Sequence, residues 1–238
     1  MKNVLFLVFT AFTLFVQAQQ LQFHYDFRHA IDPAFNIKNF PSLSFEYFKA
    51  NDSLGSFLLK MQTDFTGEKS NPAQVFLQVS QNLRFWKPKV YLSLSYSGGL
   101  GIAPSAYGYY ISNAFSAGAS YPFQWKGAIF SANLNYRYTA FTKGSHDMQF
   151  NFYFWKGFFN YKLQTAGSFV AWTQNRDQGL EFTKDLSGKK FALFGDPQIW
   201  LKIMSKVSIG SRINVFYHVL TDKNEVQMYP TLAVKREF

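Results

Sequence analysis

The chain of 238 residues contains no cysteine, which excludes disulfide bonds, thiolate nucleophiles and cysteine-based metal sites. It also lacks any apolar run of about 18 residues, the length that a membrane-spanning helix needs. Acidic residues are few, 14 against 24 lysines and arginines, so the formal net charge is +10. We interpret this excess as scattered along the chain. Nucleic acid is therefore not an expected partner, because it would require a clustered basic face, whereas anionic lipid headgroups explain the charge more simply.

Aromatic side chains, in contrast, are abundant and make up 20% of the chain, with 29 phenylalanines and 14 tyrosines. In the segment Asp147–Trp155 every second residue is large and apolar: Met148, Phe150, Phe152 and Phe154. Successive side chains of a strand point to opposite faces, so this segment predicts a strand with one oily and one polar surface. The same alternation recurs along most of the chain.

This pattern predicts an all-β fold: a transmembrane, up-and-down antiparallel β-barrel of 12 strands, whose oily face contacts the lipid bilayer and whose polar face lines a lumen. Pro197 and Pro230 fall within two of these strands and should mark bulges or strand ends, because proline cannot donate to the hydrogen-bond ladder. The expected strands are Leu21–Arg28, Ser42–Ala50, Leu54–Phe65, Gln74–Arg84, Lys89–Ser97, Tyr107–Ser120, Ala128–Ala140, Asp147–Trp155, Phe158–Ala171, Phe191–Ile203, Val207–Leu220 and Val226–Phe238.

The connections between these strands alternate in length, which is typical of outer-membrane barrels with short turns on one rim and longer loops on the other. The glycine-rich stretch Gly98–Gly101 is interpreted as part of a loop and not as a phosphate cradle, because neither a helix nor a lysine follows it. The short connections are Asn51–Ser53, Phe85–Pro88, Tyr121–Gly127, Lys156–Gly157 and Met204–Lys206. The others are His29–Pro41, Thr66–Ala73, Gly98–Ala106, Phe141–His146, Trp172–Lys190 and Thr221–Glu225.

The two ends of the chain indicate where in the cell the protein is located. Residues 1–18 combine Lys2, an apolar stretch and the small-residue ending of Val16-Gln17-Ala18, as in a cleaved secretory signal peptide. The barrel domain then spans residues 19–238. Phe238 closes an amphipathic final strand, which resembles the signal read by the outer-membrane assembly machinery. We therefore expect a protein of the outer membrane of a Gram-negative bacterium.

The polar phase of the strands supplies a lumen of mixed charge with interspersed aromatic rings. Such a lumen suits a small, polar, uncharged solute, although the same side chains could instead pair across strands and fill the space. The predicted pore-lining residues are Asp26, Arg28, Glu46, Lys60, Asp196, Gln198, Trp200, Arg212, Asn214 and His218. Further inward positions include Asn133, Asn135, Arg137, Asp147, Gln149, Asn151, Asn160 and Lys162.

Three functions stay open: a passive channel, a closed structural or adhesion barrel that acts through its loops, and a lipid hydrolase. No enzyme activity is expected, because Ser145 and His146 are adjacent and should point apart. Asp26 and Glu46 could form a carboxylate pair, but nearby basic residues should neutralise them. No cofactor is expected, and a metal between His24 and His218 is not favoured.

Several segments resemble the Tsx-like family of nucleoside-specific outer-membrane channels, and an allied family of uncharacterised barrels of similar length. The resemblance implies a twelve-stranded monomeric barrel that admits nucleosides or similar small polar molecules. The segments that carry it are Phe23–Phe27, Leu43–Phe48, Phe194–Gln198 and the aromatic closing strand.

Overall fold

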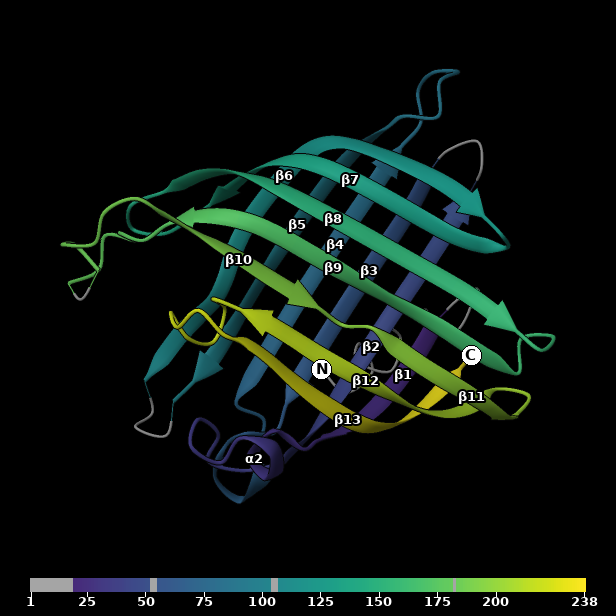
Figure 1. Cartoon of the computed structure of the whole chain (residues 1–238), viewed down its shortest axis with the longest axis horizontal. Coiled ribbons are helices and arrows are strands. Elements are labelled where there is room, and N and C mark those ends of the chain that lie inside the picture. Colours follow the sequence, from purple (N-terminus) through teal and green to yellow (C-terminus); the bar gives the residue numbers. More distant parts are fainter. Residues whose placement is uncertain (1–18, 52–54, 104–106, 182) are drawn as a thin grey trace, which may run out of the picture.

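The computed structural model of the protein describes residues 19–51, 55–103, 107–181 and 183–238 (Figure 1). The predicted signal peptide, residues 1–18, lies outside them. None of the described helices is long and apolar enough to cross a membrane. The elements are β1 Gln19–Asp26, α2 Arg28–Ile31, β2 Phe40–Asn51, β3 Gly55–Asp64, η2 Glu68–Ser70, β4 Gln74–Leu83, β5 Tyr91–Ile102, β6 Gly108–Trp125, β7 Ala128–Thr139, β8 Ser145–Phe158, β9 Leu163–Asn175, β10 Lys189–Gly195, β11 Gln198–Met204, β12 Val207–Tyr217 and β13 Val226–Glu237.

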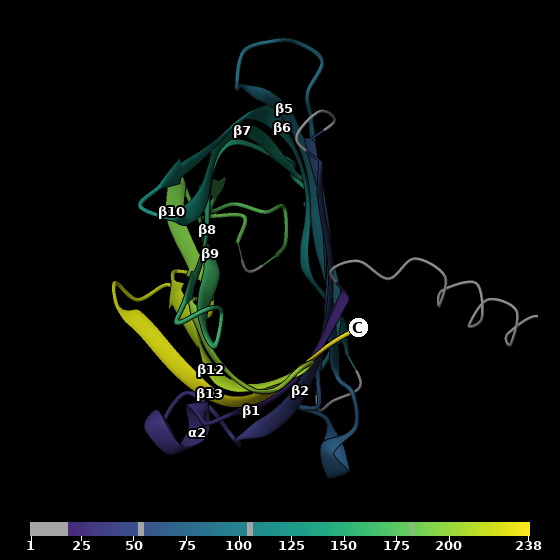
Figure 2. The ribbon, with the colours of Figure 1, turned by 90° about the vertical axis from the view of Figure 1, so that its right-hand side faces the viewer.

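The strands form a closed antiparallel barrel. Apart from β10 and β11, each strand pairs with its neighbours in the chain, and β1 pairs with β13 to close the ring. β10 and β11 share one position, because both lie between β9 and β12. The predicted twelve-strand fold is therefore confirmed, with the expected strand Phe191–Ile203 divided in two. Seen end-on, the barrel is flattened, with β2 to β5 forming the wall opposite β8 to β10 (Figure 2).

The two prolines behave differently. Pro197 stands between β10 and β11, so the expected interruption of the strand is confirmed there. Pro230 lies inside β13 opposite Ile213 without a register shift, so the irregularity expected at Pro230 is wrong. Its carbonyl accepts a hydrogen bond from Phe27 N at 3.3 Å. The missing N–H of Pro230 would face Phe27, the first residue after the end of β1. The β1–β13 hydrogen-bond ladder therefore loses little.

The two faces of the barrel wall reverse the arrangement of a soluble protein. On β8, Met148 and Phe150 are 55% and 44% exposed on the outside, whereas Asp147 and Gln149 on the inside are 4% and 7% exposed. An outer wall of exposed large apolar side chains would be unfavourable in water and is normal against hydrocarbon. The alternation found in the sequence is thus the alternation between lipid-facing and lumenal side chains.

The two rims differ in their connections. The terminal rim carries both Gln19 and Phe238 together with the turns 126–127, 159–162 and 205–206 and the longer connection 84–90. The loop rim carries the connections 27–39, 65–73, 140–144, 176–188 and 218–225, which include α2 and η2. Residues 52–54 and 104–106, which belong to two further predicted connections, lie outside the described residues. Among the described connections, the expected sorting of loop lengths is confirmed apart from the connection 84–90.

Two predicted connections are wrong because their glycines lie inside strands. Gly98–Gly101 belongs to β5, which pairs with β6 through a bulge between Gly99 and Leu100. A Cβ atom at Gly101 would lie 2.3 Å from the ring of Tyr109 on β6, so this ring covers the glycine and excludes a side chain there. Gly157 similarly belongs to β8, which extends to Phe158.

The real β8–β9 turn contains no glycine. Phe159, Asn160 and Tyr161 take φ values of 50°, 54° and 62°, in the left-handed region that non-glycine residues seldom adopt. Asn160 and Lys162, which were expected to face the lumen, therefore lie in an exposed turn. Composition carried no signal for this turn.

Candidate functional site

Three of the predicted pore-lining residues meet near the loop-rim end of β1. Arg28 donates to the Asp26 carboxylate from Nε to Oδ1 (3.1 Å) and from Nη2 to Oδ2 (2.8 Å). Asn214 Nδ2 donates to the same Oδ2 at 3.3 Å. The Arg28 guanidinium also lies 4.7 Å and 5.2 Å from the ring centroids of Phe40 and Tyr229. Asp26 is thus neutralised by Arg28, as expected.

A second group lies near mid-height of the barrel. Lys60 Nζ forms an ion pair with Asp196 Oδ2. The other oxygen, Asp196 Oδ1, accepts hydrogen bonds from the backbone N of Ser168 at 2.8 Å and from its Oγ at 2.7 Å. Glu46 stands directly opposite Lys60 in the β2–β3 register. Charge-assisted bonds to a buried carboxylate are stronger than neutral ones, so Asp196 is firmly held.

The Lys60–Asp196 pair crosses the lumen. Around the ring, β3 is separated from β10 by β2, β1, β13 and β12 on one side and by β4 to β9 on the other. Asp196 directly follows β10, and β3 and β10 lie in facing walls of the flattened barrel (Figure 2), so the ion pair joins these two walls. A second contact also joins the two walls: Gln78 Nε2 on β4 donates a hydrogen bond to the Tyr153 hydroxyl on β8 at 3.2 Å. These two contacts narrow the lumen at mid-height.

Part of the lumen nevertheless has room. Glu46, Lys60, Gln78 and Tyr153 each keep some exposed surface, although all of them point inward; the Lys60 side chain is 12% exposed. The exposed part of an inward-pointing side chain can only face the lumen. The strip along β2, β3, β4 and β8 therefore borders unfilled space inside the barrel, and we refer to these four residues as the lumenal strip.

The opposite side of the lumen, along β1, β11 and β13, is filled. Trp200 is 2% exposed, and its Nε1 donates to Gln198 Oε1 at 3.0 Å. The ring of His24 meets Trp200 edge-on with centroids 6.0 Å apart, and Lys235 Nζ lies 5.1 Å from the Trp200 ring. His24 also hydrogen-bonds Thr231 Oγ1 at 2.9 Å. These side chains pack against one another and leave no surface for a solute.

Arg212 is the most deeply enclosed of the predicted cationic residues, at 1% exposure. It interacts electrostatically with Asp196, Asp64 and Asp26, so it links the two carboxylate groups described above. Its Nε has no hydrogen-bond partner among the described residues. Unfilled space inside the barrel thus borders Glu46 and Lys60 and does not border Arg212.

His218 does not join the other predicted site residues. β12 ends at Tyr217, and His218 lies in the following loop with a φ of 53°. Its ring nitrogens contact Phe191 O and Asn224 Oδ1, each at 2.8 Å. His24 and His218 are therefore apart. Within the described part of the chain, no cluster of three or more His, Asp or Glu side chains is placed to hold a metal ion.

Ser145 and His146 point to opposite sides of the wall. Ser145 is fully buried and its Oγ donates to Asp147 inside the barrel. His146 contacts the hydroxyl of Tyr136 on the outer face. The expectation that these neighbours diverge is confirmed, and they cannot act together as nucleophile and base.

A further polar cluster on β7, β8 and β9 was not among the predicted site residues. Arg137 donates to Gln149 Oε1 at 2.8 Å and lies 4.8 Å from the ring centroid of Trp172. Asp147, opposite Arg137 in the register, accepts hydrogen bonds from Thr173 Oγ1 at 2.9 Å and from Lys189 Nζ at 2.8 Å. The inward phase of β7 and β8 already indicated these positions, but only the register shows that they meet.

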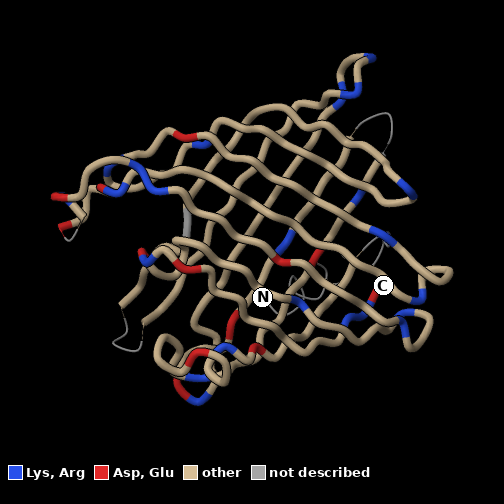
Figure 3. The backbone as a smooth tube through the Cα atoms, viewed as in Figure 1, with Lys and Arg blue, Asp and Glu red and all other residues tan. Residues whose placement is uncertain are grey.

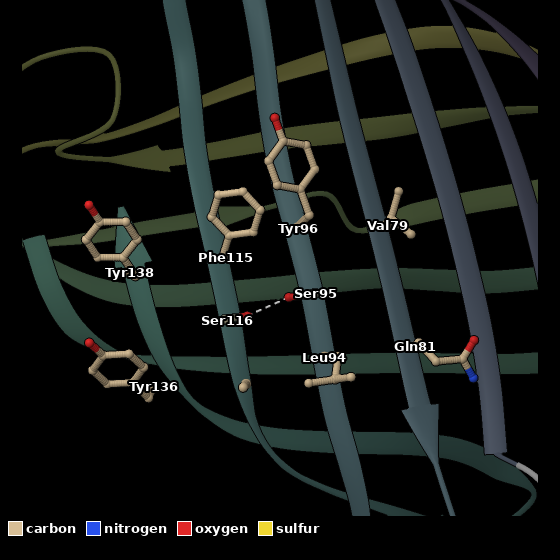
Figure 4. A pocket seen from close by; sticks show the side chains of 10 residues that line it. Val79, Gln81, Leu94, Ser95, Tyr96, Phe115, Ser116, Tyr136 and Tyr138 are labelled. Carbon is tan, nitrogen blue, oxygen red and sulfur yellow. Dashed lines mark hydrogen bonds between the residues drawn. The ribbon is translucent and has the colours of Figure 1, made fainter. Parts of the chain in front are cut away.

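The outer wall carries a shallow groove of about 460 Å³ over β4 to β7. Figure 4 shows Tyr96, Phe115 and Tyr138 along one side of it, while the hydroxyls of Ser95 and Ser116 bond to each other. Because Tyr96, Phe115 and Tyr138 belong to the outward phase, the groove faces hydrocarbon. It is separate from the lumenal site.

A closed antiparallel barrel with an oily exterior and a polar lumen defines the class of the protein: it has the fold of the outer-membrane β-barrels. The chain belongs to the DUF5020 family, described as a domain of unknown function, which matches residues 18–238. No curated protein matches the chain.

Among solved structures, the chain is similar to the NanC porin, with a TM-score of 0.55 and 8% identity over 93% of this chain and 100% of that chain. LpxR from Salmonella typhimurium gives a TM-score of 0.46 at 8% identity, over 93% and 100% of the two chains. The Acinetobacter baumannii outer membrane protein Omp33 gives 0.38 at 14% identity, over 93% and 98%. The NanC similarity supports the barrel fold.

Proposed function

We propose that the protein is a narrow passive channel for small polar solutes in the outer membrane of a Gram-negative bacterium, with nucleosides as the favoured class. The observation that carries the proposal is the lumenal strip, whose inward side chains keep exposed surface at mid-height. It combines a carboxylate, an ammonium, an amide and a phenol, which together can hydrogen-bond a neutral solute and stack on a ring. The resemblance to Tsx-like channels supports nucleosides within that class.

In this proposal the Lys60–Asp196 pair forms the constriction. Because it presents one positive and one negative group, it favours neither cations nor anions strongly, in keeping with an uncharged solute. Glu46 opposite Lys60 adds a hydrogen-bond acceptor at the same level.

Swelling of liposomes that contain the purified protein tests the proposal. We expect uridine and adenosine to enter faster than sugars and amino acids of similar size. Equal rates for all solutes would remove the nucleoside preference and leave the channel. Absence of swelling with every solute, together with zero conductance in planar bilayers, would overturn the channel itself.

The second candidate is a closed structural or adhesion barrel that acts through its loops. The filled side of the lumen favours it, because Trp200, Arg212 and His24 are almost completely buried. Single-channel conductance separates the two functions, since a plugged barrel conducts no ions.

Two accompanying proposals concern assembly. Phe238 is 42% exposed at the end of the chain, next to Arg236, whose guanidinium lies 5.3 Å from its ring centroid. We expect Phe238→Ala to slow insertion by purified assembly machinery without changing spontaneous folding in detergent; an equal effect on both would remove this role.

We also expect the protein to be a monomer, which a measurement of its mass in a detergent micelle checks.

A further inference from the structure

The positive charge of the protein is concentrated on the terminal rim. Figure 3 shows basic residues at the turns and strand ends along this edge. Of the described residues on this rim, Glu237 alone is acidic. Basic residues that are scattered along the sequence are brought together at this edge, because hairpins place residues that are distant in the sequence side by side. We name these residues the basic collar: Lys87, Lys89, Lys126, Lys156, Lys162, Lys202, Lys206 and Arg236.

The loop rim is different, because acidic residues lie among its lysines and several of these lysines form salt bridges. Lys143 contacts Asp177 at 2.7 Å and Lys190 contacts Asp222 at 2.8 Å. Lys184 pairs with the adjacent acidic side chain three positions before it. On the terminal rim, the one salt bridge between described residues joins Glu237 to Lys235, which points into the lumen. The collar therefore carries a net charge that the loop rim does not.

Aromatic rings hold the collar at the depth of a membrane interface. Lys126 Nζ lies 5.1 Å from the ring centroid of Trp125, and Lys156 Nζ lies 5.0 Å from that of Phe158. Trp86 and Trp125 are 44% and 64% exposed at the same rim. Tryptophan beside lysine or arginine is the usual composition at the boundary between hydrocarbon and headgroups, where the long basic side chains reach outward to the charged layer.

We propose that the basic collar binds anionic phospholipid headgroups of the leaflet that surrounds the terminal rim. The collar residues come from four separate connections and from the nearby ends of β8, β11 and β13, so the charge follows the circumference of the barrel. A leaflet surrounds the whole circumference, whereas a soluble acidic partner would contact one side of it. This inference rests on the barrel fold and is independent of whether the lumen conducts.

Quenching of tryptophan fluorescence by brominated lipids tests the proposal, because Trp86 and Trp125 lie at the collar. The protein is placed in bilayers with equal fractions of brominated phosphatidylglycerol or brominated phosphatidylcholine. We expect a preference of about fivefold or more for the anionic lipid, from the attraction of even one basic residue to an anionic surface. The preference should fall in high salt, which screens exposed charges.

The triple variant Lys87→Gln/Lys89→Gln/Lys126→Gln should bring this preference close to one. The matched control Lys69→Gln/Lys184→Gln/Lys223→Gln removes the same charge from the loop rim and should keep the preference. Heat-modified migration in gels verifies that both variants are folded. No preference in the native protein, or equal losses in the two variants, would overturn the proposal. Absence of lipid preference with tight binding of polyglutamate would overturn it in favour of a soluble acidic partner.

Discussion

Lys60 and Asp196 form an ion pair across the lumen although 136 positions separate them in the sequence. The two partners are held unequally. Asp196 is fixed to its own wall by the two hydrogen bonds from Ser168, whereas Lys60 reaches across on a flexible four-carbon stem. In the proposed channel, Lys60 is therefore the partner that moves when a solute passes.

The first prediction concerns this pair. The double variant Lys60→Ser/Asp196→Ser shortens both side chains and should raise single-channel conductance, because the contact that crosses the lumen is gone. The single variant Lys60→Ala leaves a buried carboxylate without its cation and should lower the free energy of unfolding by about 3 kcal/mol or more.

The control for this experiment is another ion pair of the same chain, Glu181 with Lys184 on the loop rim. Glu181→Ser/Lys184→Ser removes two exposed charges far from the constriction and should leave conductance unchanged. An unchanged conductance in the lumenal double variant would show that the pair is not the constriction.

The second prediction uses two adjacent residues on opposite faces of β8. Ser145→Ala removes a donor to Asp147 and the acceptor of the Asn175 backbone N–H (2.8 Å), and should cost about 1–3 kcal/mol. His146→Ala on the outer face should cost about 0.5 kcal/mol. Urea unfolding followed by tryptophan fluorescence measures both. Equal effects would contradict the assignment of faces, and labelling of Ser145 by a fluorophosphonate would reopen the hydrolase.

The third prediction concerns the break between β10 and β11. Gly167 has a φ of 153°, and a Cβ atom there would lie 2.7 Å from Pro197 Cα and 2.9 Å from Asp196 O. Gly167→Ala should therefore destabilise the barrel by about 2 kcal/mol, because backbone on both sides would have to shift. In the control, Gly108→Ala, the added methyl meets no atom within 4 Å. The same unfolding assay should show little change for it.

The fourth prediction is a pH effect on the 176–188 loop. A hydrogen bond from Lys143 Nζ, with a second from the Gly179 backbone N, holds the pKa of Asp177 below its usual value. The ionised carboxylate is thus the form that the folded loop prefers. The ionised carboxylate stabilises the folded loop above the ordinary aspartate pKa of about 4. This stabilisation is lost as the pH falls through the lowered pKa of the folded state. The loop should become more mobile in acid.

A spin label at Ser187 reports this mobility. Asp177→Asn should reproduce the acid mobility at neutral pH, while Asp185→Asn in the same loop should not. Mobility that stays constant between neutral and acidic pH in the native protein would contradict the prediction. Asp222 on the next loop should behave alike, since Lys190 lowers its pKa in the same way.

The strands themselves were predictable because alternation is a local property. Each residue of a strand turns its side chain opposite to its neighbours, so a short window such as Asp147–Trp155 is enough to separate the two faces. The ends of strands were less predictable. Gly157 indicated a turn that in the structure begins two residues further on and covers Phe159–Lys162. Three residues of this turn are left-handed without being glycine, so the residue types carried no signal for it.

The inward residues of the candidate site were also predictable, but their partners were not. Asp26 and Arg28 are two positions apart at the end of β1, so their ion pair could be expected from the sequence. The pairs Lys60–Asp196 and Gln78–Tyr153 join walls that the chain reaches many strands apart. Which levels face each other depends on the stagger between strands, and residue types do not encode that stagger locally.

The order of residues alone thus determined the barrel, the side of each strand that faces lipid, and the number of strand positions, because these follow from periodicity and hydrophobicity. Closure of the sheet decided the rest. By joining β1 to β13 it brought Asp196 to Lys60 inside, buried Arg212, and collected lysines from separate hairpins on one rim. Contacts between distant strands depend on register and curvature, which exist only once the ring has formed.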